Sequence, residues 1–235
     1  KLLSFTDNRQ DASLQAGHFN DFVRIALLRA ALVAALQQKP ELSYDEVASA
    51  VVDNSGLQLS DYARQPNLNP QSPYGQQVRK TFCELIEYRL YEDLRREWRY
   101  TQPNLETLGL LRIEYHGLRE LCEDDSSWGF CEALAQRTPE EREAIVRVLL
   151  DQFRYKFAIQ APILEPDTQE RLRRRCEQEL NEYWGLDPAV DDLLESRVMV
   201  LERGERRPPK PMGAVLGSRS TIGRYLCQQL RLGAN

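Results

Sequence analysis

Apolar residues recur at helical spacing over the first forty positions, and this regularity restricts the fold more than any other feature of the sequence. Residues three and four apart lie on one face of an α-helix, so the pattern predicts one long helix up to Pro40, or two with a joint near Gly17. Asp7 or Asn8 is suited to cap its start. The apolar positions are Ala12, Ala16, Phe19, Val23, Ala26, Leu27, Ala30, Ala31 and Leu36.

A short apolar run, Leu2–Phe5, precedes this helix and is typical of a core strand. No second strand follows it closely, so its partners are expected outside this chain. We therefore expect residues 2–6 to be exposed or frayed, or to pair with one of two later strand-like stretches, 111–115 or 198–201.

Capping signals mark the starts of later helices. Ser43 and Glu46 have the spacing of a capping box, and Thr138 followed by Pro139 is a strong helix start. Gly56 fits a left-handed helix exit. These signals and the apolar spacing predict helices over residues 44–54, 74–98, 138–157, 166–184 and 220–231, with a proline-rich loop over 64–73.

Few strands are expected in the rest of the chain. Residues 111–115 alternate apolar and charged side chains, which predicts a strand, and residues 198–201 form a second short apolar run. Two helices followed by a strand favour a winged-helix-like portion. The predicted fold is mainly α, a multi-helix domain with a few short strands, divided into residues 1–40, 41–118 (the winged-helix-like module), 119–202 (a helical module) and 203–235 (a basic, proline-rich connector and a last helix).

The composition indicates a globular, cytoplasmic protein without a membrane partner. Hydrophobic residues make up 42% of the chain, and no apolar run approaches the roughly 20 residues that span a bilayer. No secretory leader is recognisable. Five scattered cysteines with no CxxC pair and only two histidines predict reduced thiols and no metal site. The net charge of −5 opposes indiscriminate coating of nucleic acid but permits a local basic groove.

Several active-site motifs are missing from the sequence. There is no GxxxxGK[ST] loop for nucleotide phosphates and no DExD or DExH for magnesium, so we expect no cofactor in this chain and no ATP hydrolysis by it alone. HExxH, GxSxG and GxGxxG are absent too. His18 and His116 lack neighbours that would make them catalytic bases. Glu123-Asp124-Asp125 is interpreted as a solvated turn in preference to a carboxylate site.

Three stretches resemble a group of large bacterial superfamily 2 helicases of the DEAD/DEAH type. The first, KLLSFTDNRQDASLQAGHFNDF at residues 1–22, is similar to the start of the second RecA-like domain of that group. There an apolar strand carries motif IV, and the loop after it approaches the nucleic-acid backbone. The other two stretches, in the same order, are residues 98–106 with 109–111, and residues 216–226.

The resemblance implies an ATP-dependent DNA helicase or translocase as the parent protein. Its partners would be DNA, or RNA, and the remaining helicase domains, and its cofactors ATP and magnesium. Neither the first RecA-like domain nor the arginine-rich motif VI is present in this sequence. The chain therefore resembles a fragment, in which one motor strand is followed by a large helical insertion that returns toward the motor after residue 216.

Two short stretches are the predicted nucleic-acid contacts, because each lies where a helix begins. The first N–H groups of a helix and nearby side chains can bind a phosphate together. The alternative for both stretches is ordinary helix capping with a surface arginine. The predicted contacts are Thr6, Asn8, Arg9 and Gln10 in the first stretch and Ser218, Arg219, Ser220 and Arg224 in the second.

The remaining arginine-rich helices alternate basic with acidic residues. This pattern over residues 74–98 and 171–179 favours a salt-bridged, solvated surface over DNA contact. Two functions stay open: an accessory region that positions nucleic acid for the motor, or a helical protein–protein interaction scaffold of a larger motor complex. A free-standing winged-helix regulator is disfavoured by the unpaired first strand.

Overall fold

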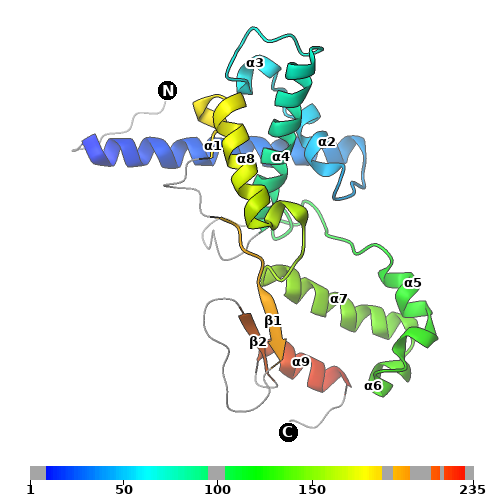
Figure 1. Ribbon diagram of the computed structural model, residues 1–235. Helices are drawn as coiled ribbons and strands as arrows, with labels where there is room; N and C mark the ends of the chain where they lie inside the picture. Colours follow the sequence, from blue (N-terminus) through cyan, green and yellow to red (C-terminus); the bar gives the residue numbers. More distant parts are fainter. Residues whose placement is uncertain (1–8, 95–103, 187–192, 202–212, 218–219, 231–235) are drawn as a thin grey trace. The chain divides into compact units, whose positions relative to one another are not determined.

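The chain folds into two compact units, each formed from two separate stretches of sequence (Figure 1). The computed structural model describes residues 9–94, 104–186, 193–201, 213–217 and 220–230. Unit 1 comprises Lys1–Tyr91 and Asp167–Asp192, and unit 2 comprises Glu92–Pro166 and Leu193–Asn235. The predicted mainly α fold is confirmed. Residues 167–192 pack with the first part of the chain, a long-range association that the four consecutive segments expected from the sequence do not include.

Unit 1 is built from helices. Of the two alternatives predicted for the start of the chain, one long helix or two with a joint near Gly17, the structure has one helix, α1. The predicted left-handed exit is present at Gly56, with a φ of 74°. The helix predicted from residue 44 begins at Val47, and the one predicted to reach Trp184 ends at Glu179. The elements are α1 (Arg9–Gln38), α2 (Val47–Asn54), α3 (Leu59–Tyr62), α4 (Pro73–Leu94), α8 (Pro166–Glu179) and the short 3-10 helix η4 (Glu182–Trp184).

The core of unit 1 is centred on Phe82 of α4, which is fully buried. Its ring stacks on Tyr62 at a centroid distance of 4.0 Å and meets the edge of Trp184 at 5.0 Å. Backbone hydrogen bonds join the same segments, since the Asn181 N–H donates to the Tyr62 carbonyl at 2.9 Å. The aromatic contacts therefore unite stretches of chain that lie more than a hundred positions apart.

Unit 2 contains the remaining helices and a two-stranded sheet. Helix α7 begins at the predicted capping box, in which the Thr138 hydroxyl accepts from the Glu141 N–H and the Glu141 carboxylate accepts from the Thr138 N–H. The elements are α5 (Leu118–Glu123), the 3-10 helix η2 (Asp125–Trp128), α6 (Glu132–Ala135), α7 (Pro139–Tyr155), the 3-10 helix η3 (Pro162–Leu164), β1 (Val198–Leu201), β2 (Gly213–Leu216) and α9 (Thr221–Leu230).

The strand predictions have a mixed outcome. The strand predicted at 198–201 is confirmed as β1, but it pairs in parallel with β2, which the sequence did not suggest. The strand predicted at 111–115 is wrong. Its residues alternate between half-buried and exposed as expected, yet they form no strand, because no described segment offers them a backbone partner.

The winged-helix-like arrangement needs a strand within residues 41–118. The described part of that range contains no strand, and the module itself stays a prediction. The apolar run Leu2–Phe5 lies outside the described residues, and its pairing stays a prediction. Among the described residues, no helix is both long and apolar enough to cross a membrane.

Helix α7 ends at an unusual left-handed residue, Phe157, with a φ of 58°. The Phe157 N–H donates to the Arg154 carbonyl and the Ala158 N–H to the Phe153 carbonyl, which is the hydrogen-bond pattern of a Schellman helix end. Glycine is favoured there because a Cβ costs about 1–2 kcal/mol in this conformation. Burial of the Phe157 ring offsets that cost.

All five cysteines are free thiols. Cys176 in unit 1 and Cys122 in unit 2 are buried, and the other three are partly exposed. Burial raises the pKa of the Cys176 thiol to about 12 and also raises the pKa of Cys122. Both buried thiols are therefore neutral, as expected for reduced core cysteines.

We expect Gly75→Ala to destabilise unit 1. A Cβ at this position of α4 would lie 2.2 Å from the Asn69 carbonyl oxygen, so the backbone of the preceding loop would have to move. The free energy of unfolding in urea should fall by about 2 kcal/mol, as for overpacking. Gly129→Ala is the control, because its φ is −58° and its added Cβ would meet nothing closer than 4.0 Å. Equal stability of the two variants would contradict the close approach.

Candidate nucleic-acid interface

The first predicted contact stretch lies at the start of α1. Arg9 and Gln10 form the first turn of this helix, whereas Thr6 and Asn8 lie outside the described residues. A helix of this length presents its first N–H groups without intrahelical partners at that end. The position therefore has the local backbone arrangement that the prediction requires.

The second predicted stretch lies at the start of α9, in the other unit. The Ser220 hydroxyl accepts from the Gly223 N–H at 3.0 Å and donates to the Gly217 carbonyl at 2.7 Å. Ser220 thus caps the helix, which is the alternative role considered for it. Arg224 is exposed one turn into α9, and Ser218 and Arg219 lie outside the described residues. Because the two stretches belong to different units, each is a candidate by itself.

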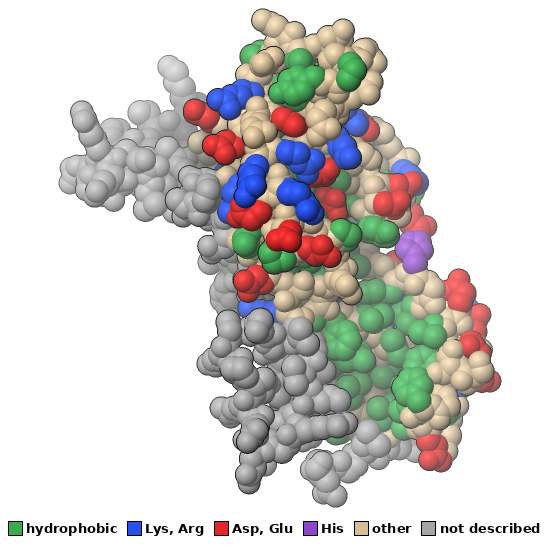
Figure 2. Space-filling model, viewed as in Figure 1, with side chains coloured by type: hydrophobic (Ala, Val, Ile, Leu, Met, Phe, Trp, Pro, Cys, Tyr) green, Lys and Arg blue, Asp and Glu red, His purple; other side chains and the backbone are tan. Residues whose placement is uncertain are grey.

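The arginines of α8 form a mixed surface with neighbouring acids. Figure 2 shows basic and acidic side chains interleaved over this helix. Arg173 pairs with Glu170 at 3.1 Å, and Arg175 pairs with Glu84 of α4. These pairs agree with the salt-bridged surface predicted from the alternation of charges, and they reduce the positive charge available to a phosphate backbone.

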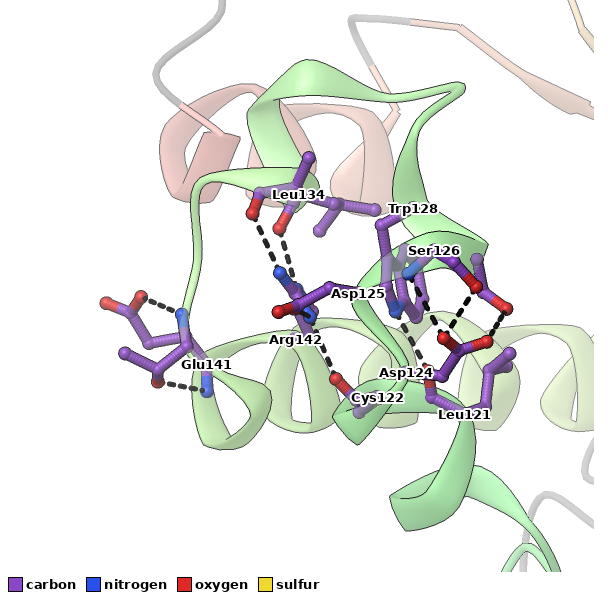
Figure 3. A network of polar contacts seen from close by, with 12 residues as sticks. Leu121, Cys122, Asp124, Asp125, Ser126, Trp128, Leu134, Glu141 and Arg142 are labelled. Atoms are coloured by element: carbon purple, nitrogen blue, oxygen red, sulfur yellow. Dashed lines mark hydrogen bonds and ion pairs between the residues drawn. The ribbon is translucent and has the colours of Figure 1, made fainter.

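Two buried arginines of α7 were not anticipated from the sequence. Arg142 is 2% exposed, and its guanidinium donates to three backbone carbonyls and to the Asp125 carboxylate (Figure 3). The acceptors are the carbonyls of Leu134 (2.9 Å), Cys122 (2.9 Å) and Ala135 (2.7 Å) and Oδ1 of Asp125 (2.6 Å). Arg142 therefore satisfies backbone groups that α5 and α6 leave without helical partners.

The acidic stretch 123–125 is part of the same structure. The Asp124 carboxylate accepts from the hydroxyls of Ser126 and Ser127, both at 2.6 Å, and from the Ser126 N–H (Figure 3). These hydrogen bonds lower the pKa of Asp124. The stretch is therefore a hydrogen-bonded turn, as interpreted from the sequence. Within the described residues, no group of three or more His, Cys, Asp or Glu is arranged to hold a metal ion.

Arg154 forms a second buried cluster, which fastens residues 104–115 to α7. Its guanidinium makes two parallel hydrogen bonds to Glu106, at 2.6 and 2.7 Å, and one to Asp151 at 3.1 Å. Although burial disfavours the charge, the hydrogen bonds to Glu106, Tyr115 and Asp151 raise the pKa of Arg154. Each charged group in the cluster has a hydrogen-bonded partner, so we interpret the cluster as a structural contact that holds residues 104–115 against α7.

Sequence reasoning missed Arg142 and Arg154 because charged residues are normally assigned to the surface of a helix. The available signal was weak. Arg142 lies three residues before Ile145, which is buried, and so it shares the inner face of α7. The acids that pair with these arginines lie in other segments, and the sequence does not reveal which segments meet.

Comparisons with protein-family models, with curated proteins and with solved structures find no match to this chain.

We expect Arg154→Met to destabilise unit 2 by about 2–3 kcal/mol. The substitution would leave Glu106 and Asp151 half-buried without their cation, and losing one partner of a buried pair is costly. Urea unfolding followed by circular dichroism measures the effect. Arg112→Met is the matched control, because 83% of the Arg112 side chain is exposed, and it should change stability by less than about 0.5 kcal/mol. A similar effect of both variants would refute the structural role.

Tyr115 gives this cluster a pH dependence. Burial, partly opposed by Arg154 and reinforced by the hydrogen bond to Asp151, raises the pKa of Tyr115 to about 12. The folded state then holds this proton more strongly than the unfolded state, whose tyrosines ionise near the ordinary value of about 10.

The contribution of the protonated Tyr115 hydroxyl to the free energy of unfolding should therefore be fully present below about pH 10. It should be lost as the pH rises through about 12. Tyr115→Phe should lower the free energy of unfolding at pH 8 by about 1 kcal/mol and flatten its fall at alkaline pH. The measurement is a series of urea unfolding curves across this range. Tyr44→Phe, at a tyrosine 77% exposed, is the control and should keep the wild-type alkaline slope. If the free energy of unfolding of Tyr115→Phe fell with alkaline pH as steeply as that of the wild type, Tyr115 would not be the cause of the pH dependence.

Proposed function

We propose that this chain is a nucleic-acid-binding accessory region of an ATP-dependent DNA helicase or translocase, with no ATPase site of its own. The observation that carries the proposal is the resemblance of residues 1–22 to the motif IV region of DEAD/DEAH-type helicases. The start of α1 at Arg9 supports it, because motif IV is followed by a loop and then a helix.

The chemistry of the two candidate stretches also supports the proposal. A phosphate at the start of α1 would meet the first N–H groups of the helix, the positive end of its dipole and the Arg9 side chain. At α9 the hydroxyl of Ser220 caps the Gly223 N–H, so the contact would be made by Arg219, Arg224 and the other N–H groups of the first turn. Such contacts read the backbone and not the base sequence.

The proposed role of this chain is to hold and orient the nucleic acid. The chain would hold the nucleic-acid backbone while other domains of the parent bind ATP and magnesium and perform hydrolysis. The residues of this chain do not include a phosphate-binding loop or an acidic magnesium motif, so no step of hydrolysis is assigned to them. The proposed location is the cytoplasm of a bacterium.

DNA binding by the isolated chain is the test. We expect weak binding of labelled single-stranded DNA that declines steeply with salt, and no ATPase activity. Arg9→Ala and Arg219→Ala should each weaken the binding and reduce the slope of log K against log salt by about 0.7, the contribution of one phosphate contact. Fluorescence anisotropy at several salt concentrations measures both quantities.

Arg112→Ala serves as the matched control, since this arginine is exposed and lies in neither candidate stretch. Its affinity and salt slope should equal those of the wild type. The proposal fails if Arg9→Ala and Arg219→Ala bind as the control does, or if the chain binds one sequence with an affinity independent of salt.

A further inference from the structure

The segment from α5 to α6, residues 118–135, presents an exposed aromatic ring. We call this segment the α5–α6 tip. Phe130 lies between η2 and α6 and is 83% exposed, more than any other large hydrophobic side chain in the described part of the chain. Leu121 of α5 adds a second exposed apolar side chain, 45% exposed, to the same segment. Figure 2 shows hydrophobic side chains gathered on the surface of unit 2.

The turn that carries Phe130 is firmly held. Trp128 is buried beside it, with a ring-centroid distance of 6.2 Å to Phe130, and its indole N–H donates to the Leu121 carbonyl at 2.9 Å (Figure 3). The Cys131 N–H donates to the Trp128 carbonyl at 2.9 Å and so closes the turn around Phe130. The Arg142 guanidinium lies over the Trp128 ring, 5.9 Å from its centroid. Because the backbone of this turn is fixed by hydrogen bonds, little backbone entropy is lost when a partner covers Phe130.

The charges around Phe130 restrict the kind of partner. All five acidic residues of the tip are exposed. Glu123 is paired with Arg119, the single basic residue of the tip, at 3.0 Å, and Asp125 is paired with Arg142 of α7 at 2.6 Å. The carboxylates of Glu120, Asp124 and Glu132 remain as an acidic excess over these two arginines. A phosphate backbone would be repelled by this surface, whereas lysine and arginine side chains would be attracted. The acidic residues are Glu120, Glu123, Asp124, Asp125 and Glu132.

We propose that the α5–α6 tip is a docking surface for a basic protein segment. An apolar side chain of the partner covers Phe130, and lysine or arginine residues on either side of it face the carboxylates of the tip. The inference is independent of nucleic-acid binding by α1 and α9, which lie outside this segment.

The test uses the whole chain and labelled amphipathic peptides. One peptide is made of leucine and lysine, and the second has glutamate at each lysine position. We expect only the lysine peptide to bind, with an affinity that falls as salt is raised. Phe130→Ser should weaken that binding at least about tenfold, as loss of an aromatic anchor does. The double charge reversal Glu120→Lys with Glu132→Lys should weaken it as well.

Tyr44→Ser is the matched control, because this aromatic side chain is 77% exposed in the other unit, and it should bind the lysine peptide as the wild type does. Circular dichroism should show that Phe130→Ser keeps the wild-type fold, given its exposure. Equal binding by Phe130→Ser and wild type would overturn the proposal. So would loss of single-stranded DNA binding in Phe130→Ser, which would identify base stacking, or loss of self-association, which would identify a second copy of the chain.

Discussion

The contact of Phe82 with both Tyr62 and Trp184 is the interaction on which unit 1 depends. It joins α3, α4 and the segment after α8 in one aromatic core, although Trp184 follows Phe82 by about a hundred residues and unit 2 begins between them. A contact between such distant positions has to be formed against the loop-closure entropy of the intervening chain. The apolar area of three aromatic rings supplies the compensation.

Unit 2 is organised differently, around two buried arginines. Arg142 binds backbone carbonyls at the ends of α5 and α6, and Arg154 fastens an extended segment to α7 through Glu106. Buried ion pairs contribute little net stability, but they penalise alternative packings in which a charge would lose its partner. The short helices α5 and η2 bury Leu118, Cys122 and Trp128 in a small apolar cluster, and the polar contacts of Arg142 fix their ends beside it. The same contacts hold the turn that presents Phe130.

Local signals in the sequence predicted local structure well. The Thr138 capping box, the long first helix and the left-handed exit at Gly56 are all present, because each depends on neighbouring residues alone. The strand predictions failed where they depend on tertiary contacts: residues 111–115 alternate as expected but no described segment pairs with them, and β2 is defined by its pairing with the distant β1. One local signal also failed, because α2 begins at Val47 and its N-cap is Glu46, not Ser43. Of the candidate site, the sequence could place Ser220 and Arg224 at a helix start, but it could not distinguish a cap from a phosphate contact.

The two buried thiols give each unit a reporter of its own opening. Cys176 in unit 1 and Cys122 in unit 2 are both almost fully covered, and their raised pKa values keep them in the unreactive thiol form. A thiol reagent reaches such a sulfur only when the structure around it opens. The rates at which a thiol reagent modifies Cys176 and Cys122 therefore measure how often unit 1 and unit 2 open. A ligand that stabilises only one unit should slow the modification of the cysteine in that unit alone.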